Sequence, residues 1–191
     1  MRFEDGQVMH LYPHTIQDFG LYSGKELTEE EFSSLQKAAG AMSAKMRAVR
    51  ILSATSVSKK DLEQRLVQKG EDPTQAKEAV AWMEELSLVD DAKTAEQVVH
   101  RCISKGYGLA RAKQALYEKR IPKEYWEEAL RDYPDQADSI EAFLHSRLGA
   151  SPDEKTVKKT IDALLRRGHS YYQIRKALNN LSVDTDDLPE G

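Results

Sequence analysis

The sequence predicts a mainly α-helical protein of three tandem three-helix repeats, each helix-turn-helix-like, behind a small N-terminal β-containing cap. Similar residues recur at intervals of 50 and then 48 positions, counted from the anchors Leu66, Leu116 and Leu164. Apolar residues follow each anchor at helical spacing, and helix-capping residues lie between the apolar runs. A three-helix unit of this size has a thin core, so we expect the repeats to stack into an elongated, curved body.

The first 40 residues differ from the repeats and predict the cap. Residues 4–7 are typical of a turn between short strands, and residues 8–12 are expected to be extended before a proline. Thr28 and Glu31 form a capping-box pattern, which predicts a helix that ends before Gly40. The predicted cap is therefore a small hairpin followed by one helix.

Each repeat is predicted to hold one leading helix and then a pair of helices joined by a tight turn. The leading helices are expected at residues 43–53, 91–105 and 135–148. Four positions after the anchors stand Gly70, Arg120 and Gly168, where glycine is typical of a helix C-terminus. Helix-opening residues follow two positions later, namely Asp72, Pro122 and Ser170. The predicted segments are the cap (1–40), three repeats (41–90, 91–133, 134–181) and a disordered acidic tail (182–191).

Composition favours a cytoplasmic protein without a membrane segment. Cys102 is the only cysteine, so an internal disulfide is excluded and a reducing compartment is expected. No apolar run approaches the roughly 18 residues of a membrane span, and residues 1–6 lack the apolar region of a signal peptide. The net charge of −4 is uneven, because residues 154–181 carry 7 Lys/Arg against 2 Asp/Glu and the tail carries only acids.

The sequence predicts no catalytic, cofactor or metal site. The five histidines form no metal-spaced pair on a helix, and one cysteine cannot build a zinc cluster. Gly106-Tyr107-Gly108 begins like a dinucleotide fingerprint but lacks the third glycine and the preceding strand. We interpret it as a tight link between two helices, and we expect a non-enzymatic binding protein.

Several motifs, in order along the chain, resemble the RecX family of recombination regulators. The most specific is Asp90-Asp91 in its Leu-Ser-Leu-Val-Asp-Asp context, followed by Lys-Gly-Tyr-Gly at residues 105–108. Leu-Leu-Arg-Arg-Gly-His-Ser at residues 164–170 continues the resemblance, which covers about residues 44–181. Two departures are Thr55, where the family often has Arg, and Arg120, which replaces the usual Gly and predicts a different turn geometry there.

The resemblance implies a monomer that binds the RecA recombinase filament on single-stranded DNA and modulates, usually inhibits, its ATPase and strand-exchange activities. Residues 165–176 combine four basic groups with two tyrosines, the ingredients of a surface that tracks phosphates and stacks on bases, so weak direct nucleic-acid contact is also expected. The candidate partner-binding residues are Arg111, Lys113, Lys119, Arg120, Arg166, Arg167, Tyr172, Arg175 and Lys176. Two alternatives stay open: a direct DNA-binding helical-repeat protein, and a helical adaptor with no recombinase partner.

Overall fold

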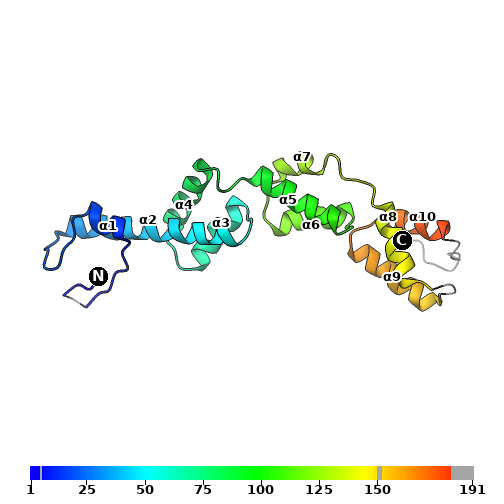
Figure 1. Cartoon of the computed structure of the whole chain (residues 1–191), viewed down its shortest axis with the longest axis horizontal. Helices are drawn as coiled ribbons and strands as arrows, with labels where there is room; N and C mark the ends of the chain where they lie inside the picture. The colour runs from blue at the N-terminus through cyan, green and yellow to red at the C-terminus, as the bar shows by residue number, and fades with distance from the viewer. Residues whose placement is uncertain (5, 150–151, 182–191) are drawn as a thin grey trace. The chain divides into compact units, whose positions relative to one another are not determined.

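The computed structural model describes residues 1–4, 6–149 and 152–181, and these fold into helices joined by short turns (Figure 1). The elements in chain order are α1 (Pro13–Asp18), α2 (Glu29–Ala54), α3 (Lys59–Gln68), α4 (Pro73–Glu85), α5 (Asp91–Ser104), α6 (Leu109–Glu118), the 3-10 helix η1 (Lys123–Tyr125), α7 (Trp126–Leu130), α8 (Ala137–Arg147), α9 (Glu154–Arg166) and α10 (Tyr171–Asn180). The chain divides into two compact units, Met1–Asp90 and Asp91–Gly191. No helix within the described part of the chain is long and apolar enough to cross a membrane.

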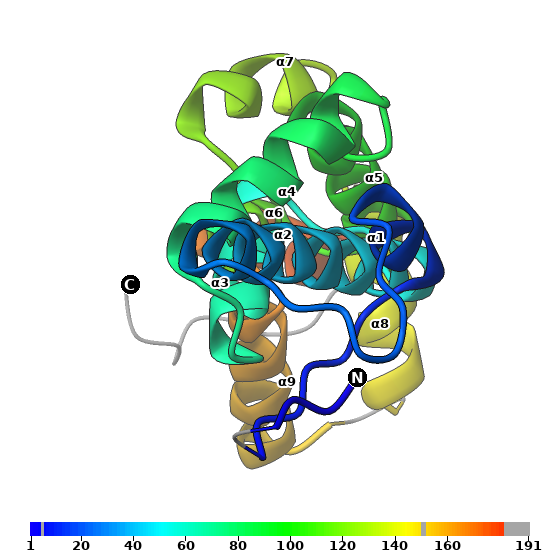
Figure 2. The same ribbon diagram turned by 90° about the vertical axis from the view of Figure 1, so that its left-hand side faces the viewer.

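The predicted β-containing cap is wrong. The described residues contain no strand, and Arg2 and Val8 form only an isolated antiparallel bridge. The extended segment is too short to pair further, because Pro13 opens α1 and fixes Tyr12 as its N-cap. The beginning of the chain instead contacts a helix, with the ring of Phe3 packed edge-on against Phe32 of α2 at 5.1 Å between centroids. Figure 2 shows α1 beside α2 in this unit.

The two helices predicted on either side of Gly40 are one helix of 26 residues, α2. Its capping box is confirmed, since Thr28 Oγ1 accepts from the backbone N–H of Glu31 at 3.1 Å and Glu31 Oε2 accepts from that of Thr28 at 2.8 Å. Glycine inside a helix costs only about 1 kcal/mol relative to alanine, so packing overrides it. A Cβ at Gly40 would overlap the side chain of Gln75, so the glycine permits close approach of α4.

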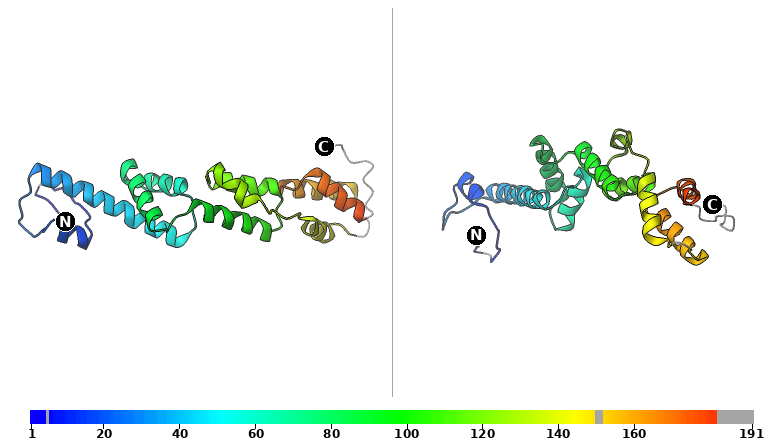
Figure 3. Two further views of the ribbon diagram at one scale, coloured as in Figure 1. Left: turned by 90° about the horizontal axis from the view of Figure 1, so that it is seen from above. Right: turned by 45° about the vertical axis from the view of Figure 1, so that its right-hand side comes forward.

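Three hydrophobic clusters form the interior, one in the first unit and two in the second. We call the copies built around Leu66 (α2–α4), Leu116 (α5–α7) and Leu164 (α8–α10) the first, second and third repeats. Each of these three leucines is fully buried, as their spacing predicts. Figure 3 shows α8, α9 and α10 packed together as the third repeat. The limits predicted for the repeats stay a prediction, and the tail at 182–191 lies outside the described residues.

The turn after each anchor leucine has the same backbone hydrogen bonds in all three repeats. The anchor carbonyl accepts from the N–H five residues later, at 3.1, 3.1 and 3.2 Å, from Glu71, Ile121 and His169. The residue just before these has a positive φ: 91° at Gly70, 54° at Arg120 and 86° at Gly168. The different turn geometry predicted from Arg120 is therefore wrong, because the arginine adopts the left-handed conformation that glycine adopts in the other repeats.

The residue after the left-handed position is buried in every repeat, but its chemistry differs. In the first repeat it is Glu71, whose carboxylate accepts from Arg47 at 2.5 Å and from Ser43 at 3.0 Å. Both partners belong to α2, so this half-buried ion pair joins the leading helix of the repeat to the turn. Ile121 fills the equivalent position in the second repeat with an apolar side chain, and His169 fills it in the third.

Candidate functional site

All nine predicted partner-binding residues lie in the unit formed by the second and third repeats. They form three groups: α6 and its end (Arg111, Lys113, Lys119, Arg120), the end of α9 (Arg166, Arg167) and one side of α10 (Tyr172, Arg175, Lys176). The groups differ in how much of each side chain is left for a partner.

The α10 group is the most accessible of the three. Tyr172 is 76% exposed, and Arg175 and Lys176 follow it by three and four residues, so the three side chains share one side of the helix. The opposite side is buried in the core of the third repeat through Ile174 and Leu178. Helix α10 begins with a complete capping box at Ser170, which fixes where this surface starts. We call Tyr172, Arg175 and Lys176 the α10 face.

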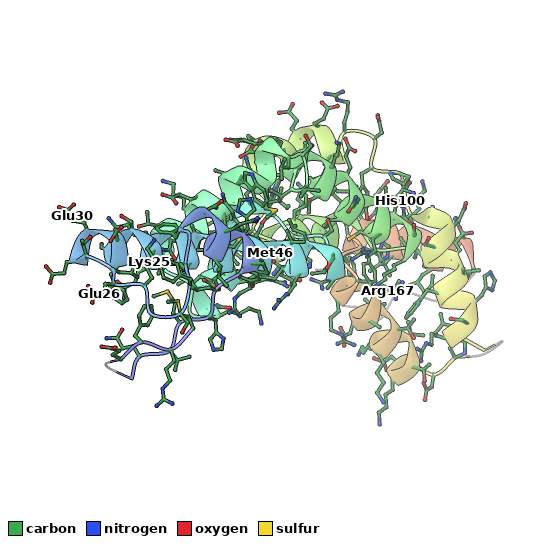
Figure 4. All side chains as sticks on the ribbon, turned by 60° about the vertical axis from the view of Figure 1, so that its left-hand side comes forward. Lys25, Glu26, Glu30, Met46, His100 and Arg167 are labelled. Atoms are coloured by element: carbon green, nitrogen blue, oxygen red, sulfur yellow. The ribbon has the colours of Figure 1, made fainter. Side chains whose placement is uncertain are left out.

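The two adjacent arginines at the end of α9 have different environments. Arg166 is exposed and forms no ion pair with any residue in the described ranges. The guanidinium of Arg167 donates through Nη2 to the carbonyl oxygen of Lys105 at 2.5 Å, and its charge lies 5.0 Å from the ring centre of Tyr107. It also lies 5.2 Å from the ring centre of Phe143. Figure 4 labels Arg167 where α9 ends. Its head group is therefore engaged within the fold, whereas that of Arg166 is available.

Along α6, Arg111 is engaged and Lys113 is open to solvent. Arg111 Nη1 donates to Glu118 Oε1 at 2.9 Å, and this hydrogen bond raises the pKa of Arg111 and lowers the pKa of Glu118. The pair is largely exposed, so it contributes little to stability. Lys119 and Arg120 stand at the C-terminal end of α6, where positive charge is favoured by the helix dipole.

The glycine-tyrosine-glycine segment, predicted to be a tight link, also contacts the third repeat. The Gly108 N–H donates to the carbonyl oxygen of Arg167 at 2.9 Å, and the Tyr133 hydroxyl donates to the carbonyl oxygen of Tyr107 at 2.6 Å. Burial raises the pKa of Tyr133 to about 12, which keeps this hydroxyl protonated as a donor. A Cβ at Gly108 would overlap the carbonyl group of Gly168, so the two turns touch through backbone atoms. Sequence reasoning missed this junction.

His169 is the buried ionisable group of the junction, only 4% exposed. Its Nε2 lies 3.1 Å from the carbonyl oxygen of Gly106, which requires Nε2 to carry the proton that it donates. Its Nδ1 has no hydrogen-bond partner within the described part of the chain. Burial lowers the pKa of His169, Arg167 lowers it further, and the bond to Gly106 and the charge of Asp135 oppose this. The neutral imidazole is thus the form that fits.

A second feature that sequence reasoning missed is an exposed apolar residue directly after each anchor leucine. The side chains are Val67 at 39% exposure, Tyr117 at 68% and Leu165 at 41%. Because the anchors recur at a fixed register, these three residues are equivalent positions of the three repeats. The sequence contained the signal, since an apolar residue at anchor +1 points away from the side that buries the anchor.

No group of His, Cys, Asp and Glu side chains suited to a metal ion occurs among the residues that the structure describes. Cys102 is buried in α5, and burial raises the pKa of its thiol, which disfavours the reactive thiolate.

Comparison with known proteins finds RecX proteins by sequence and a similar fold by structure. The family model "RecX, second three-helix domain" matches residues 90–130. The regulatory protein RecX of Streptococcus gordonii is 25% identical over 190 residues, covering 97% of this chain and 74% of the relative. That of Vibrio parahaemolyticus is 28% identical over 152 residues, covering 75% of this chain and 95% of the relative.

Two crystal structures have a similar fold. One, of a regulatory protein RecX, has a TM-score of 0.67 at 20% identity and covers 88% of this chain and 86% of its own. The other, of RecX from Lactobacillus salivarius, has a TM-score of 0.66 at 23% identity and covers 77% of this chain and 99% of its own. At these identities the two structures support the fold.

Proposed function

We propose, from the premise that this chain belongs to the RecX family of regulatory proteins, that it is a non-enzymatic cytoplasmic regulator of the RecA recombinase. In this proposal the chain binds the RecA filament on single-stranded DNA. Bound there, it lowers the ATP turnover and strand exchange of the filament.

The observation that carries the proposal is the exposed apolar residue at the same position of each repeat. Val67, Tyr117 and Leu165 each stand directly after the anchor leucine of their own repeat. The turn that follows has the same backbone hydrogen bonds in all three repeats. A protein with equivalent contact groups on successive repeats suits a partner whose own contact sites recur, as identical subunits of a filament do. Aromatic side chains such as that of Tyr117 are enriched among the residues that contribute most binding energy, whereas charges at the edge of an interface contribute little.

Inhibition follows if the chain prefers one conformation of the filament. A ligand shifts a conformational equilibrium only by the difference between its affinities for the two states. A chain that contacts neighbouring protomers binds best when their spacing matches that of its repeats. It would thereby oppose the rearrangements that accompany ATP hydrolysis, without any chemistry of its own.

The test is a titration of the purified protein into RecA that hydrolyses ATP on single-stranded DNA. We expect ATP turnover to fall at protein amounts well below the amount of RecA, because one chain spans several protomers. The same titration without RecA checks whether the protein hydrolyses ATP itself. Unchanged turnover at equimolar protein would contradict the proposal.

Direct binding to nucleic acid is the second candidate function, and the α10 face favours it. Tyr172 can stack on a base while Arg175 and Lys176 contact the phosphates on either side. Binding to bare single-stranded DNA with a steep dependence on salt, together with unchanged RecA turnover, would select this function. Inhibition of RecA at a salt concentration that abolishes binding to bare DNA would reject it.

A further inference from the structure

We propose that Arg167 is a positioning residue for partner binding, because it joins the third repeat to the second and so holds Tyr117 and Leu165 at a fixed separation. The inference deepens the proposed function and rests on it, since these two side chains are among the contact groups of that proposal. The junction between the repeats is a property of this chain alone and can be measured without RecA.

The second and third repeats have separate hydrophobic cores. One core includes Leu116 and the other includes Leu164, and the two share no buried residue of the described chain. Among the described residues of this unit, extensive helix packing lies within one repeat or the other: α5 packs on α6 and α7, and α8, α9 and α10 pack on one another. Apolar packing therefore stabilises each repeat, and contacts of another kind must fix one repeat against the other.

The hydrogen bonds that join the two repeats run between the turn before α6 and the turn after α9. They are, from donor to acceptor, Arg167 Nη2 to the Lys105 carbonyl at 2.5 Å, the Gly108 N–H to the Arg167 carbonyl at 2.9 Å, and His169 Nε2 to the Gly106 carbonyl at 3.1 Å. We call these contacts the clamp. Arg167 takes part in two of the three, once through its guanidinium and once through its backbone.

An aromatic ring from each repeat holds the guanidinium of Arg167 in place. Its charge lies 5.0 Å from the ring centre of Tyr107 in the second repeat and 5.2 Å from that of Phe143 in the third. The planar guanidinium stacks on aromatic faces and presents its donors in a fixed fork, so little freedom is lost when it donates to the carbonyl. Arg167 thus contacts both repeats through one rigid group.

The clamp joins the two helices that carry the proposed contact groups. Leu165 stands two residues before Arg167 on α9, and Tyr117 stands on α6, which begins directly after Gly108. Two linked groups gain most from each other when their separation matches the sites on the partner. A rigid separation also lowers the entropy that is lost on binding. A loose clamp would therefore weaken binding without removing either contact group.

The first experiment measures the separation of the repeats in the full chain. Spin labels on Gln97→Cys of α5 and Lys155→Cys of α9, two exposed positions, report the distribution of distances between the repeats in a Cys102→Ala background. We expect a narrow distribution in the parent and a wider one with Arg167→Ala. An unchanged distribution would overturn the proposal.

The matched control is Arg147→Ala. Its guanidinium lies 5.5 Å from the centre of the same Phe143 ring, but both residues belong to α8. This variant should keep the narrow distribution, and equal widening would overturn the proposal. The melting temperature is measured in parallel, because a loss of stability alone does not widen the distribution far below that temperature.

Gly108→Ala loosens the clamp from its other turn. The added carbon would overlap the carbonyl group of Gly168, and a glycine has no side chain with which to contact a partner. We expect the wider distribution here as well, with the helix content retained by circular dichroism. This variant separates positioning from direct contact by the Arg167 side chain.

The second experiment measures inhibition of RecA that hydrolyses ATP on single-stranded DNA. We expect the amount of protein needed for half inhibition to rise about 3–10-fold with Arg167→Ala and with Gly108→Ala, and to stay unchanged with Arg147→Ala. Full inhibition by Gly108→Ala despite a wider distribution would overturn positioning. Weaker inhibition by Arg167→Ala alone would overturn it too, since Arg167 would then contact the partner itself.

Failure of the proposed function and failure of the clamp give different results. If the parent protein does not inhibit RecA, the proposed function fails, and the contact groups have no partner there for the clamp to serve. The distance distributions still decide whether Arg167 fixes the two repeats. If the parent inhibits RecA and its own distribution is already wide, the clamp is overturned and the proposed function stands.

Discussion

The backbone N–H of Gly108 donates a hydrogen bond to the carbonyl oxygen of Arg167 at 2.9 Å, which joins the turn before α6 to the turn after α9. The two residues are 59 positions apart in the sequence. Their turns meet without an intervening side chain, so the second and third repeats contact each other through the backbone.

We expect Gly108→Ala to lower the free energy of unfolding by about 1–3 kcal/mol, because the new methyl group would overlap the Gly168 carbonyl. The backbone at Gly108 has φ −75°, so the cost comes from space and not from conformation. The control is Gly149→Ala, where nothing lies within 4 Å of the added carbon. Urea unfolding measures both, and equal stability of the two variants would show that the turns do not touch in solution.

We expect Arg167→Ala to lower the free energy of unfolding by about 1–2 kcal/mol, through loss of the bond to the Lys105 carbonyl and of the contacts with Tyr107 and Phe143. The neighbouring Arg166→Ala removes the same charge from an exposed position and should change stability by less than about 0.5 kcal/mol. Thermal and urea unfolding check the difference. A larger loss from Arg166→Ala would contradict the assignment.

Arg120→Gly should raise stability by about 0.5–1 kcal/mol, because a left-handed conformation is strained for arginine and not for glycine. The reverse change at the equivalent position, Gly70→Ala, should lower stability by about 1–2 kcal/mol. Both are measured by urea unfolding at the same pH. If the glycine variant loses stability, the arginine side chain contributes more than its backbone strain costs.

Below about pH 6.5 the unfolding free energy should fall, and His169 should cause part of the fall. Its pKa is lowered in the fold, mainly by burial, so below the ordinary value of 6.5 the unfolded chain binds more protons than the folded one. The loss begins as the pH drops through that value and ends below the lowered pKa. We expect the melting temperature of His169→Gln to fall less between pH 7.5 and 5.5 than that of the parent. His145→Gln, at an exposed position of α8, should keep the full fall, and identical profiles for all three would exclude His169 as the cause.

Replacing the three equivalent apolar residues by serine, as Val67→Ser, Tyr117→Ser and Leu165→Ser, should weaken inhibition of RecA turnover by at least about 10-fold, since a single interface hot spot, for which Tyr117 is the residue type best suited, contributes about 2 kcal/mol or more. The side chains are exposed, so the fold should be retained, which circular dichroism checks. The control is Val49→Ser, Leu86→Ser and Leu88→Ser, three exposed apolar residues outside the repeated position. Equal loss in both triple variants would mean that general surface hydrophobicity, and not the repeat, determines binding.

The sequence predicts well those features that depend on local chemistry. The burial of Leu66, Leu116 and Leu164 follows from their periodicity, and the capping boxes at Thr28 and Ser170 follow from three-residue patterns. Such signals lie within one or two helical turns, where backbone geometry determines which side chains meet.

The features that the sequence does not predict depend on distant contacts. Gly40 is a plausible helix end by composition, and its place beside Gln75 of α4, 35 residues away, cannot be read from the local sequence. Arg166 and Arg167 are identical in the sequence, yet only the second meets Lys105. The sequence could therefore place the candidate residues on helices, but it could not separate the engaged side chains from the available ones.

The contact between Gly108 and Gly168 has a consequence for how such a chain can diverge. A mutation at either glycine changes the space left for the other turn, so the two positions cannot drift separately. A duplicated repeat that forms this contact can no longer change at this glycine without affecting the neighbouring repeat. Across relatives we expect the two sites to stay glycine together wherever the turns touch, whereas the left-handed position of the second repeat already carries Arg120.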